Sequence, residues 1–254
     1  MNTHPNITER CINSPTLTTN KLRTATKMSD SLTLHHLEYS QSFRILWILE
    51  ELGVEYQLRS YERDAKTLSA PEEYKRLSPL GTAPVITHGD LVLAESSAII
   101  DHLLDLYPRA SLRPQVGTPD RARYLFWFHS AQGSLMPLLL MSSVFKISVE
   151  KFPFFLKPFI KVYISALNKL FIGPKLDRLL EKAETDLLEA PWFGGENVTA
   201  ADFLISYNLI VGAECGWVNN NHPRCLDWIA RMKALPSFTE AQRKDGRACL
   251  SVIK

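Results

Sequence analysis

The apolar residues of positions 32–106 change their spacing in a fixed order, and this order constrains the fold more than any other feature of the chain. Residues 32–37 alternate at a period of two, as in a strand, and the largely apolar run 43–52 is typical of a helix that ends at Gly53. Residues 54–61 alternate again. A strand, a helix and a strand in succession predict a parallel strand pair with a right-handed crossover.

A hairpin and a second helix follow this unit. Residues 83–87 and 91–94 are short strand-like runs, and the sequence His-Gly-Asp between them has the composition of a tight turn. The apolar spacing of residues 98–106 predicts a helix that ends before Pro108. The order βαβ-ββα therefore predicts a small α/β domain over residues 31–109.

The chain changes character after this domain. Residues 110–119 are dense in residues that break regular structure, which predicts a linker. From residue 120 onward the apolar residues recur at helical spacing, so an all-α domain is predicted over residues 120–254. The predicted helices span residues 120–136, 149–171, 175–189, 200–214 and 225–234.

The charge balance and the cysteines exclude several classes of protein. Lys and Arg number 29 against 27 Asp and Glu, and without residues 1–30 the chain has 25 of each. Such a neutral body argues against a nucleic-acid-binding protein. The four cysteines are scattered and form no C-x-x-C pair, which favours a reducing compartment and a cytoplasmic location. No apolar run approaches the length of a membrane span, so none is predicted.

The first thirty residues differ from the rest of the chain. Residues 1–30 are rich in Thr, Asn and Ser and have no apolar stretch that could serve as a secretory signal, so we predict a disordered extension. Two alternatives stay open at this point. The segment is basic and poor in acids, as an organelle-targeting leader is, or the folded protein starts near Met28 and the segment precedes it.

Four short motifs occur in a fixed order along the chain. They are Ser40-Gln-Ser-Phe-Arg-Ile-Leu-Trp47, Pro79-Leu-Gly-Thr-Ala-Pro-Val85, Ala94-Glu-Ser96 and Thr199-Ala-Ala-Asp-Phe203. In this order and at these spacings they resemble the motifs of the cytosolic glutathione transferases, over about residues 32–245, and most closely those of a microbial and fungal branch. The resemblance implies a thioredoxin-like α/β domain followed by an all-α domain.

Two of these motifs are expected to hold glutathione. The resemblance implies that Pro84, between Ala83 and Val85, is a cis proline that presents the backbone to the cysteinyl part of glutathione. It also implies that Glu95 and Ser96 hold the γ-glutamyl end, where a helix N-terminus suits a carboxylate. The alternatives are a trans proline that starts an edge strand and a serine that only caps a helix.

The group that activates the glutathione thiol is expected between the first strand and the first helix. A thiol with an ordinary pKa of about 8.5 needs a hydrogen-bond donor and a helix N-terminus to become a thiolate at neutral pH. Counted back from Arg44, Tyr39 occupies the usual catalytic position of the family, while Ser40 matches the serine of the similar branch. We predict Ser40, with Tyr39 as the alternative, and a plain capping role for Ser40 stays open. Residues 39–42 contain no cysteine, which disfavours thiol transfer through an enzyme disulfide.

The second substrate is expected to bind in the helical domain. The resemblance places an apolar electrophile pocket near the start of this domain, where Trp127, His129 and Met136 are candidates. Aromatic and Met residues at helical spacing also form ordinary cores, so this alternative stays open. Residues 152–171 combine aromatic residues with lysines and predict either contact with a membrane surface or a helix that packs within the domain or across a dimer.

Two further features are expected to be structural. His35 and His36 are neighbours on a strand and point to opposite faces, so they do not form a metal pair, and we predict no metal site. Thr199 and Asp202 form a capping box at the start of a helix.

The function implied by the resemblance is conjugation of glutathione, as a co-substrate and without any other cofactor, to a hydrophobic electrophile. The resemblance also implies a homodimer. The alternatives are a non-catalytic binding or carrier protein of the same fold, and a glutathione-dependent peroxidase or biosynthetic enzyme.

Overall fold

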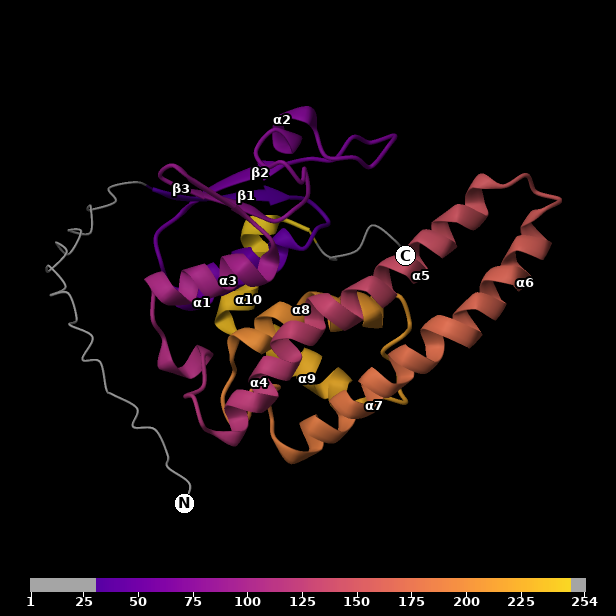
Figure 1. The fold of residues 1–254 in the computed structure, drawn as a ribbon. Coiled ribbons are helices and arrows are strands. Elements are labelled where there is room, and N and C mark those ends of the chain that lie inside the picture. The colour runs from indigo at the N-terminus through magenta and orange to yellow at the C-terminus, as the bar shows by residue number, and fades with distance from the viewer. Residues whose placement is uncertain (1–30, 248–254) are drawn as a thin grey trace, which may run out of the picture.

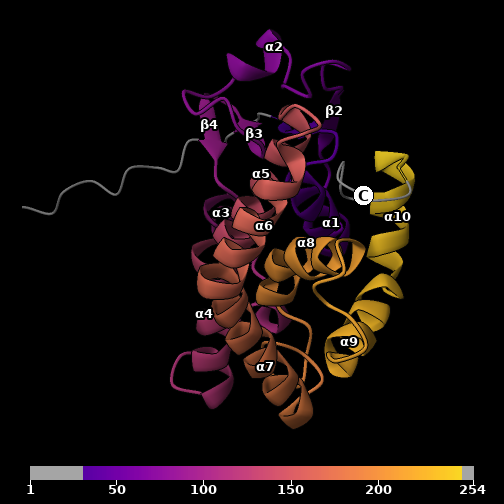
Figure 2. The same ribbon diagram turned by 90° about the vertical axis from the view of Figure 1, so that its right-hand side faces the viewer.

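The computed structural model describes residues 31–247, apart from the side chains of Ala110 and Lys146. The extension predicted over residues 1–30 lies outside the described residues. Figures 1 and 2 show a small sheet at one end of the molecule and a set of long helices at the other, which agrees with the predicted α/β domain followed by an all-α domain.

The sheet has four strands in the order β2-β1-β3-β4. The strands are β1 (Leu32–Leu37), β2 (Gln57–Tyr61), β3 (Val85–His88) and β4 (Leu91–Ala94). β1 and β2 are parallel, whereas β3 is antiparallel to both β1 and β4. The predicted βαβ-ββα order is therefore confirmed.

Three helices accompany the sheet. They are α1 (Ser42–Leu52), which ends at Gly53 in a left-handed conformation, the short α2 (Glu72–Lys75), and α3 (Ser96–Leu106). The sequence predicted α1 and α3, because their apolar spacing is strong, but not the single turn of α2. In Figure 1, α1 and α3 lie between the sheet and the helical part of the molecule.

The helical part begins after a short 3-10 turn at Ala110–Leu112, so the predicted linker contains some regular structure. The helices are α4 (Pro119–Ser130), α5 (Met136–Lys151), α6 (Lys157–Leu167), α7 (Gly173–Glu189), α8 (Ala200–Glu214), α9 (Pro223–Lys233) and α10 (Pro236–Asp245). π-helical turns at Ala131–Leu135 and Asn168–Ile172 join α4 to α5 and α6 to α7. The bounds of the predicted helix 200–214 are confirmed.

The single helix predicted over residues 149–171 is wrong. Instead, α5 and α6 form an antiparallel hairpin that projects from the rest of the molecule (Figure 1). The chain turns at Phe152, whose backbone is extended because the next residue is Pro153. Pro158 then lies in the first turn of α6, where a missing backbone N–H costs no helix hydrogen bond.

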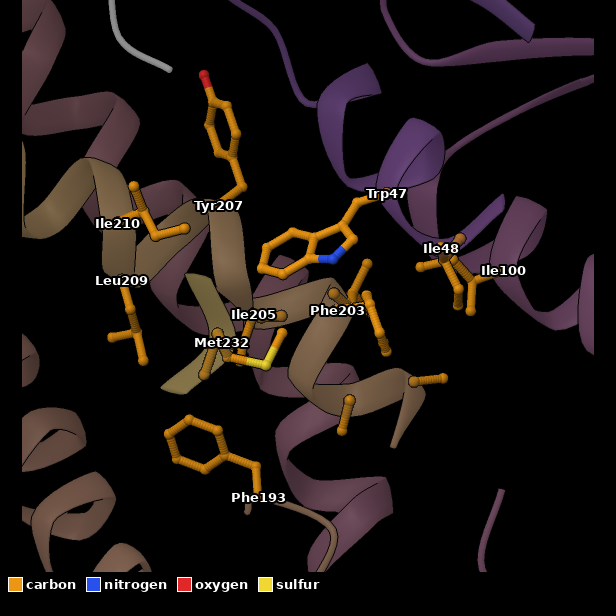
Figure 3. Close-up of a cluster of buried hydrophobic side chains, with 14 of the residues drawn as sticks. Trp47, Ile48, Ile100, Phe193, Phe203, Ile205, Tyr207, Leu209, Ile210 and Met232 are labelled. Atoms are coloured by element: carbon orange, nitrogen blue, oxygen red, sulfur yellow. The ribbon is translucent and has the colours of Figure 1, made fainter. Parts of the chain in front are cut away.

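The core joins the sheet domain to the helices. Trp47 of α1 is fully buried and packs edge-on against Phe203 of α8 and Phe238 of α10, with ring centroids 5.4 and 4.9 Å apart. Its indole nitrogen donates a hydrogen bond to Ser237. Figure 3 shows Trp47 and Phe203 in this cluster, above Met232 and Phe193. Helix α10, which the sequence did not predict, therefore packs with α8 around Trp47 of α1.

The predicted capping box at the start of α8 is confirmed. The carboxylate of Asp202 accepts hydrogen bonds from the backbone N–H and the hydroxyl of Thr199, each at 2.9 Å. It also accepts from the backbone of Phe193 and from the indole of Trp228. Asp202 is fully buried, and burial raises its pKa against the effect of these donors. The acid therefore ties three segments of the helical part together.

By length and composition alone, the continuous helical stretch Pro119–Lys151 is apolar enough to cross a membrane. No such span was predicted from the sequence. This is weak support for a membrane span, since core helices can satisfy the same criteria. Trp127 and Phe128 of this stretch are buried within the fold, where α4 packs on α8.

Candidate active site

Two adjoining cavities lie where the sheet domain meets the helices. One, of about 300 Å³, is lined mainly by the sheet domain, including Ser40, Lys75 and Ala83. The other, of about 210 Å³, is lined mainly by apolar residues of the helices. Four residues line both: Tyr39, Arg63, Met136 and Tyr207. The first cavity is the more polar of the two and is called the polar cavity below, and it shares one wall with the apolar cavity.

The turn between β1 and α1 carries the two candidate hydroxyl groups. Tyr39 has a positive φ of 47°, a conformation that favours glycine, and lines both cavities. Ser40 lines only the polar cavity and is almost completely buried. Its hydroxyl accepts a hydrogen bond from the Ser42 backbone at 3.2 Å, next to Gln41 at the helix start. Ser40 therefore satisfies one backbone N–H at the start of α1, although the N-cap position is Gln41 and not Ser40.

The Ser40 hydroxyl also belongs to a buried side-chain network. It donates to the carbonyl of Leu37 at 2.7 Å and lies 2.8 Å from the Ser42 hydroxyl. The Ser42 hydroxyl in turn lies 2.8 Å from Nδ1 of His36. His36 and His35 point to opposite faces of β1, as predicted, since His35 is paired with Tyr61 instead. The hydroxyl of Ser40 therefore has both a cavity and an internal network beside it.

The Ala83-Pro84 peptide bond is cis, as the resemblance implied. Ala83 lines the polar cavity, and Val85 begins β3 with its side chain fully buried. In the β3–β4 ladder Val85 pairs with Ala94. Pro84, just before β3, and Glu95, just after β4, therefore lie at the same end of the hairpin. Two motifs that are separate in the sequence therefore meet at one sheet end.

The start of α3 has two unusual features. Glu95 has a positive φ of 77°, which is uncommon for a residue other than glycine and is often found at functional sites. The Ser96 hydroxyl is fully buried and has no hydrogen-bond partner among the residues that the structure describes. It does not cap α3, contrary to the capping alternative. A buried hydroxyl at a helix N-terminus is suited to a ligand carboxylate.

The three candidates for the electrophile pocket occupy different places. Met136 lines both cavities. Trp127 is fully buried in the helical core and donates a hydrogen bond from its indole to Asp186 at 2.7 Å. His129 is exposed on α4 and lines neither cavity. The structure therefore brings Met136, the first residue of α5, to the site. Trp127 and His129 are not brought there, because no residue of α4 lines either cavity.

Several lining residues were not predicted. The apolar cavity is formed by α5 and α8, and no sequence motif marked these positions because apolar helix residues look alike whether they line a core or a pocket. The residues are Leu139, Leu140, Ser143 and Ile147 of α5 and Tyr207 and Val211 of α8. Of these residues, Tyr207 also lines the polar cavity.

Arg63 lines both cavities and is fixed there by hydrogen bonds to the backbone. Its guanidinium donates to the backbone carbonyls of Glu38 and Leu68, both at 2.9 Å, and to that of Tyr39 at 3.5 Å. Burial lowers the pKa of Arg63 below its ordinary value. Because arginine remains protonated at neutral pH, Arg63 supplies a positive charge beside Tyr39.

Arg44 links the two parts of the molecule beneath the site. It is fully buried and donates to the carbonyl of Leu204 at 2.5 Å and to the side chain of Asn208 at 3.1 Å. Its guanidinium lies 5.1 Å from the ring centroid of Tyr207, and burial lowers the pKa of Arg44 to about 9. The arginine of the first motif therefore positions a pocket residue rather than a ligand.

Residues 31–247 contain no cluster of three His, Cys, Asp or Glu side chains that could hold a metal ion. The hydroxyl, backbone and helix-terminus groups of the two cavities are suited to a peptide-like thiol and an apolar second substrate.

The combination of a thioredoxin-like domain, an all-helical domain and a site between them is that of the cytosolic glutathione transferases. The N-terminal domain family of glutathione S-transferases matches residues 40–106 of this chain. Glutathione S-transferase 3 of Schizosaccharomyces pombe is 33% identical over 172 residues, which cover 67% of this chain and 70% of that protein. The chain belongs to the glutathione S-transferase family.

Solved structures show the same relationship. A glutathione S-transferase from Actinobacillus pleuropneumoniae has a TM-score of 0.68 at 34% identity and covers 85% of this chain and 93% of its own. A glutathione transferase from Phanerochaete chrysosporium, solved with oxidised glutathione, has a TM-score of 0.65 at 18% identity and covers 87% of this chain and 99% of its own. At this lower identity the likeness concerns the fold alone.

Proposed function

We propose that this protein conjugates glutathione to a hydrophobic electrophile. The observation that carries the proposal is the pair of adjoining cavities, one polar and one apolar, that share Tyr39, Arg63, Met136 and Tyr207. Glutathione would occupy the polar cavity and the electrophile the apolar one, so that thiol and electrophile meet at the shared wall. Catalysis would then consist of positioning two substrates and stabilising a thiolate.

The thiolate would be stabilised by the Ser40 hydroxyl at the N-terminus of α1. This position combines a hydroxyl donor with the positive end of a helix, and both favour an anion. Tyr39 is the alternative donor, since it lines both cavities. We assign Ser40 first because only its hydroxyl belongs to the internal network at the helix start.

Glutathione would be held along the end of the β3–β4 hairpin. The backbone around Ala83, Pro84 and Val85 would pair with the cysteinyl part, while Glu95 and Ser96 would bind the γ-glutamyl end. The unpartnered hydroxyl of Ser96 supports this placement, because a buried hydroxyl without a partner costs stability unless a ligand satisfies it. We expect Ser96→Ala to weaken glutathione binding by about tenfold, as lost hydrogen bonds to a charged group do.

The test is calorimetric titration with glutathione, followed by a turnover assay with glutathione and a small aromatic halide. The wild-type protein should bind glutathione and form the thioether. Ser40→Ala should lower kcat/KM by about a hundredfold, as the loss of one donor to a developing anion does. Ser165→Ala, on the exposed face of α6, is the matched control and should leave kcat/KM unchanged. A large loss in Tyr39→Phe and none in Ser40→Ala would instead assign the donor to Tyr39.

The same experiment separates the alternatives. A non-catalytic carrier would bind apolar ligands without turnover, and absence of glutathione binding at millimolar concentration would contradict the proposed site. A glutathione-dependent peroxidase would consume glutathione when a hydroperoxide replaces the aromatic halide. The arrangement of the site favours conjugation first, because the second cavity is lined mostly by apolar side chains.

We propose a homodimer as the functional form. The α5–α6 hairpin has large apolar side chains on its surface, among them Phe159, Val162 and Tyr163, which are 74%, 72% and 62% exposed. Exposed apolar patches of this kind mark contact surfaces.

Contact of residues 152–171 with a membrane stays a prediction, and so does the cytoplasmic location. Flotation with anionic lipid vesicles tests the membrane contact, and its salt dependence would show whether the lysines contribute.

A further inference from the structure

The wall that the two cavities share contains two side chains with unused hydrogen-bond donors. One is the guanidinium of Arg63, in the segment after β2, and the other is the hydroxyl of Tyr207 on α8. Burial raises the pKa of Tyr207, and the charges of Arg44 and Arg63 oppose this rise. Both guanidiniums therefore lie within electrostatic range of the phenol, which stays protonated at neutral pH.

Arg63 keeps donors that the fold does not use. Its Nε, Nη1 and Nη2 atoms donate to the backbone carbonyls of Glu38, Leu68 and Tyr39. Each of the two terminal nitrogens carries a second N–H. These second N–H groups have no acceptor among the residues that the structure describes, and no carboxylate there forms an ion pair with the Arg63 side chain. Arg63 is therefore a cation without a direct carboxylate partner at the wall of both cavities.

The Tyr207 hydroxyl has no hydrogen-bond partner in the described part of the chain. Figure 3 shows its oxygen pointing away from the buried cluster that contains Trp47 and Phe203. The buried guanidinium of Arg44 lies 5.1 Å from the centroid of the Tyr207 ring. The fold thus holds the ring in place and leaves the hydroxyl available to a ligand.

The rest of the apolar cavity limits what these donors can bind. Leu139, Leu140, Ile147 and Val211 line this cavity with hydrocarbon side chains. Hydrogen bonds and charges act more strongly beside such a surface than in water, because the local dielectric constant is low. A pair of donors there is suited to a hydrophobic molecule with one oxygen atom that gains negative charge during the reaction.

We propose that Arg63 and Tyr207 bind the carbonyl oxygen of α,β-unsaturated carbonyl compounds and thereby select this class of hydrophobic electrophile. The inference rests on the proposed function, because it names the electrophile that the glutathione thiolate attacks. The oxygen and the β-carbon of such a compound are only a few bonds apart, so both reach the shared wall at which the thiolate is expected. An alkyl halide has no oxygen and gains nothing from the two donors.

The reaction is a conjugate addition. The sulfur of the thiolate forms a bond to the β-carbon, and the electron pair of the C=C bond moves toward the carbonyl group, whose oxygen becomes negatively charged. Arg63 and Tyr207 donate hydrogen bonds to this oxyanion. The α-carbon then takes a proton from water, which balances the proton that the glutathione thiol released when it ionised. No group leaves.

The two donors have one other use at this wall, which is to stabilise the thiolate itself. The two uses have different consequences. A donor to the thiolate lowers the thiol pKa of bound glutathione and accelerates the reaction with every electrophile. A donor to the carbonyl oxygen leaves the thiol pKa unchanged and accelerates only the addition to carbonyl compounds.

The experiment compares two electrophiles on the full-length protein. One is a long-chain 2-alkenal and the other is benzyl chloride, which contains no oxygen, and the readout is the ratio of their kcat/KM values. Tyr207→Phe should lower this ratio at least about tenfold, as the loss of one donor to a developing oxyanion does, with no change in the thiol pKa of bound glutathione. The matched control is Tyr107→Phe, because Tyr107 lines neither cavity, and it should leave the ratio unchanged.

Substitutions of the cation extend the test. Arg63→Met should also lower the ratio, and Arg63→Lys should lower it less, because lysine keeps the charge but not the planar pair of donors. The melting temperature checks that each variant is folded. Arg63→Met carries the test if Tyr207→Phe does not fold.

The outcomes separate this inference from the proposed function. An unchanged ratio in both Tyr207→Phe and Arg63→Met overturns the inference, and so does a wild-type protein that conjugates benzyl chloride but not the alkenal. An equal loss with both electrophiles in Tyr207→Phe, together with a raised thiol pKa, assigns the hydroxyl to the thiolate and also overturns it. In these cases conjugation itself stands. Glutathione binding without turnover of either electrophile contradicts the proposed function as well.

Discussion

Helices α8 and α6 are similar in composition and opposite in environment. Ten of the fifteen residues of α8 and seven of the eleven residues of α6 are apolar. Yet thirteen residues of α8 are buried, whereas α6 has no buried residue. Helix α8 lies among α1, α4 and α9, while α6 packs on α5 at the edge of the molecule (Figure 1).

This difference teaches that apolar content sets how much a helix gains from being covered, but not what covers it. For α8 the cover is the protein's own core, which includes Trp47 and Trp228. For α6 the described residues bury no side chain, and a second copy of the chain is the cover proposed above. Substitutions on the two helices should therefore have different effects.

The largest expected effect comes from a phenylalanine pair. Phe203 of α8 is fully buried against Trp47, so Phe203→Ala should lower the free energy of unfolding by about 3–5 kcal/mol through the cavity that it leaves. The matched substitution Phe159→Ala on α6 should change it by no more than about 0.5 kcal/mol. Denaturant unfolding at low protein concentration measures both. Equal costs for the two substitutions would contradict the comparison.

The start of α8 should be nearly as sensitive. Asp202→Ala removes the shared acceptor of Thr199, Phe193 and Trp228 and leaves their buried donors unpaired. We expect a loss of about 3 kcal/mol in the free energy of unfolding. Asp177→Ala, on the exposed surface of α7, is the matched control and should have little effect. A small loss in Asp202→Ala would show that water replaces these bonds.

The exposed face of α6 should matter for association instead. Phe159→Ser/Val162→Ser removes two exposed apolar side chains and should raise the dissociation constant of the dimer by about tenfold or more, while the monomer keeps its fold. Sedimentation equilibrium over a range of protein concentrations measures this constant. If the wild-type protein is a monomer at micromolar concentration, the homodimer and this explanation of the exposed face are both wrong.

The smallest effects are expected at two serines whose hydroxyls donate to a backbone carbonyl in the preceding helical turn. Ser148 of α5 donates to the Val144 carbonyl and Ser206 of α8 to the Phe203 carbonyl, both at 2.7 Å. Ser148→Ala should raise the free energy of unfolding by about 0.3 kcal/mol, because alanine has a higher helix propensity than serine. Ser206→Ala should lower it by about 1 kcal/mol through the lost buried bond. The same sign for both would show that local helix propensity outweighs burial.

The local signals of the sequence predicted much of the sheet domain and part of the helical one. Alternation and turn chemistry located all four strands, and the Thr199–Asp202 capping box located the start of α8. The helix predicted over residues 149–171 failed, because the apolar spacing continues across Pro153 although the chain reverses there. Helix α10 was not predicted because Phe238 and Ala241 are its two apolar residues, which are too few for a periodic pattern.

The candidate site was predicted unevenly for a similar reason. Candidate residues such as Ser40, Pro84 and Ser96 could be named because each lies in a short motif that carries the resemblance. Tyr207 and Arg63 could not, since both line the cavities from positions outside these motifs. Trp127 was chosen for its size and position in the sequence, but its indole is directed to Asp186 in the core.

By itself, the sequence determined the four strands with helices α1 and α3 in their order, the turn before α1 and the residues around the cis proline, because neighbouring residues decide these features. Only the tertiary structure decided that two cavities share a wall and that the α5–α6 hairpin projects from the rest of the molecule. It also decided that the carboxylate of Asp245 lies 2.7 Å from Nε2 of His36. Such contacts join residues far apart in the chain, and their energies depend on packing and on the exclusion of water, which no local pattern records.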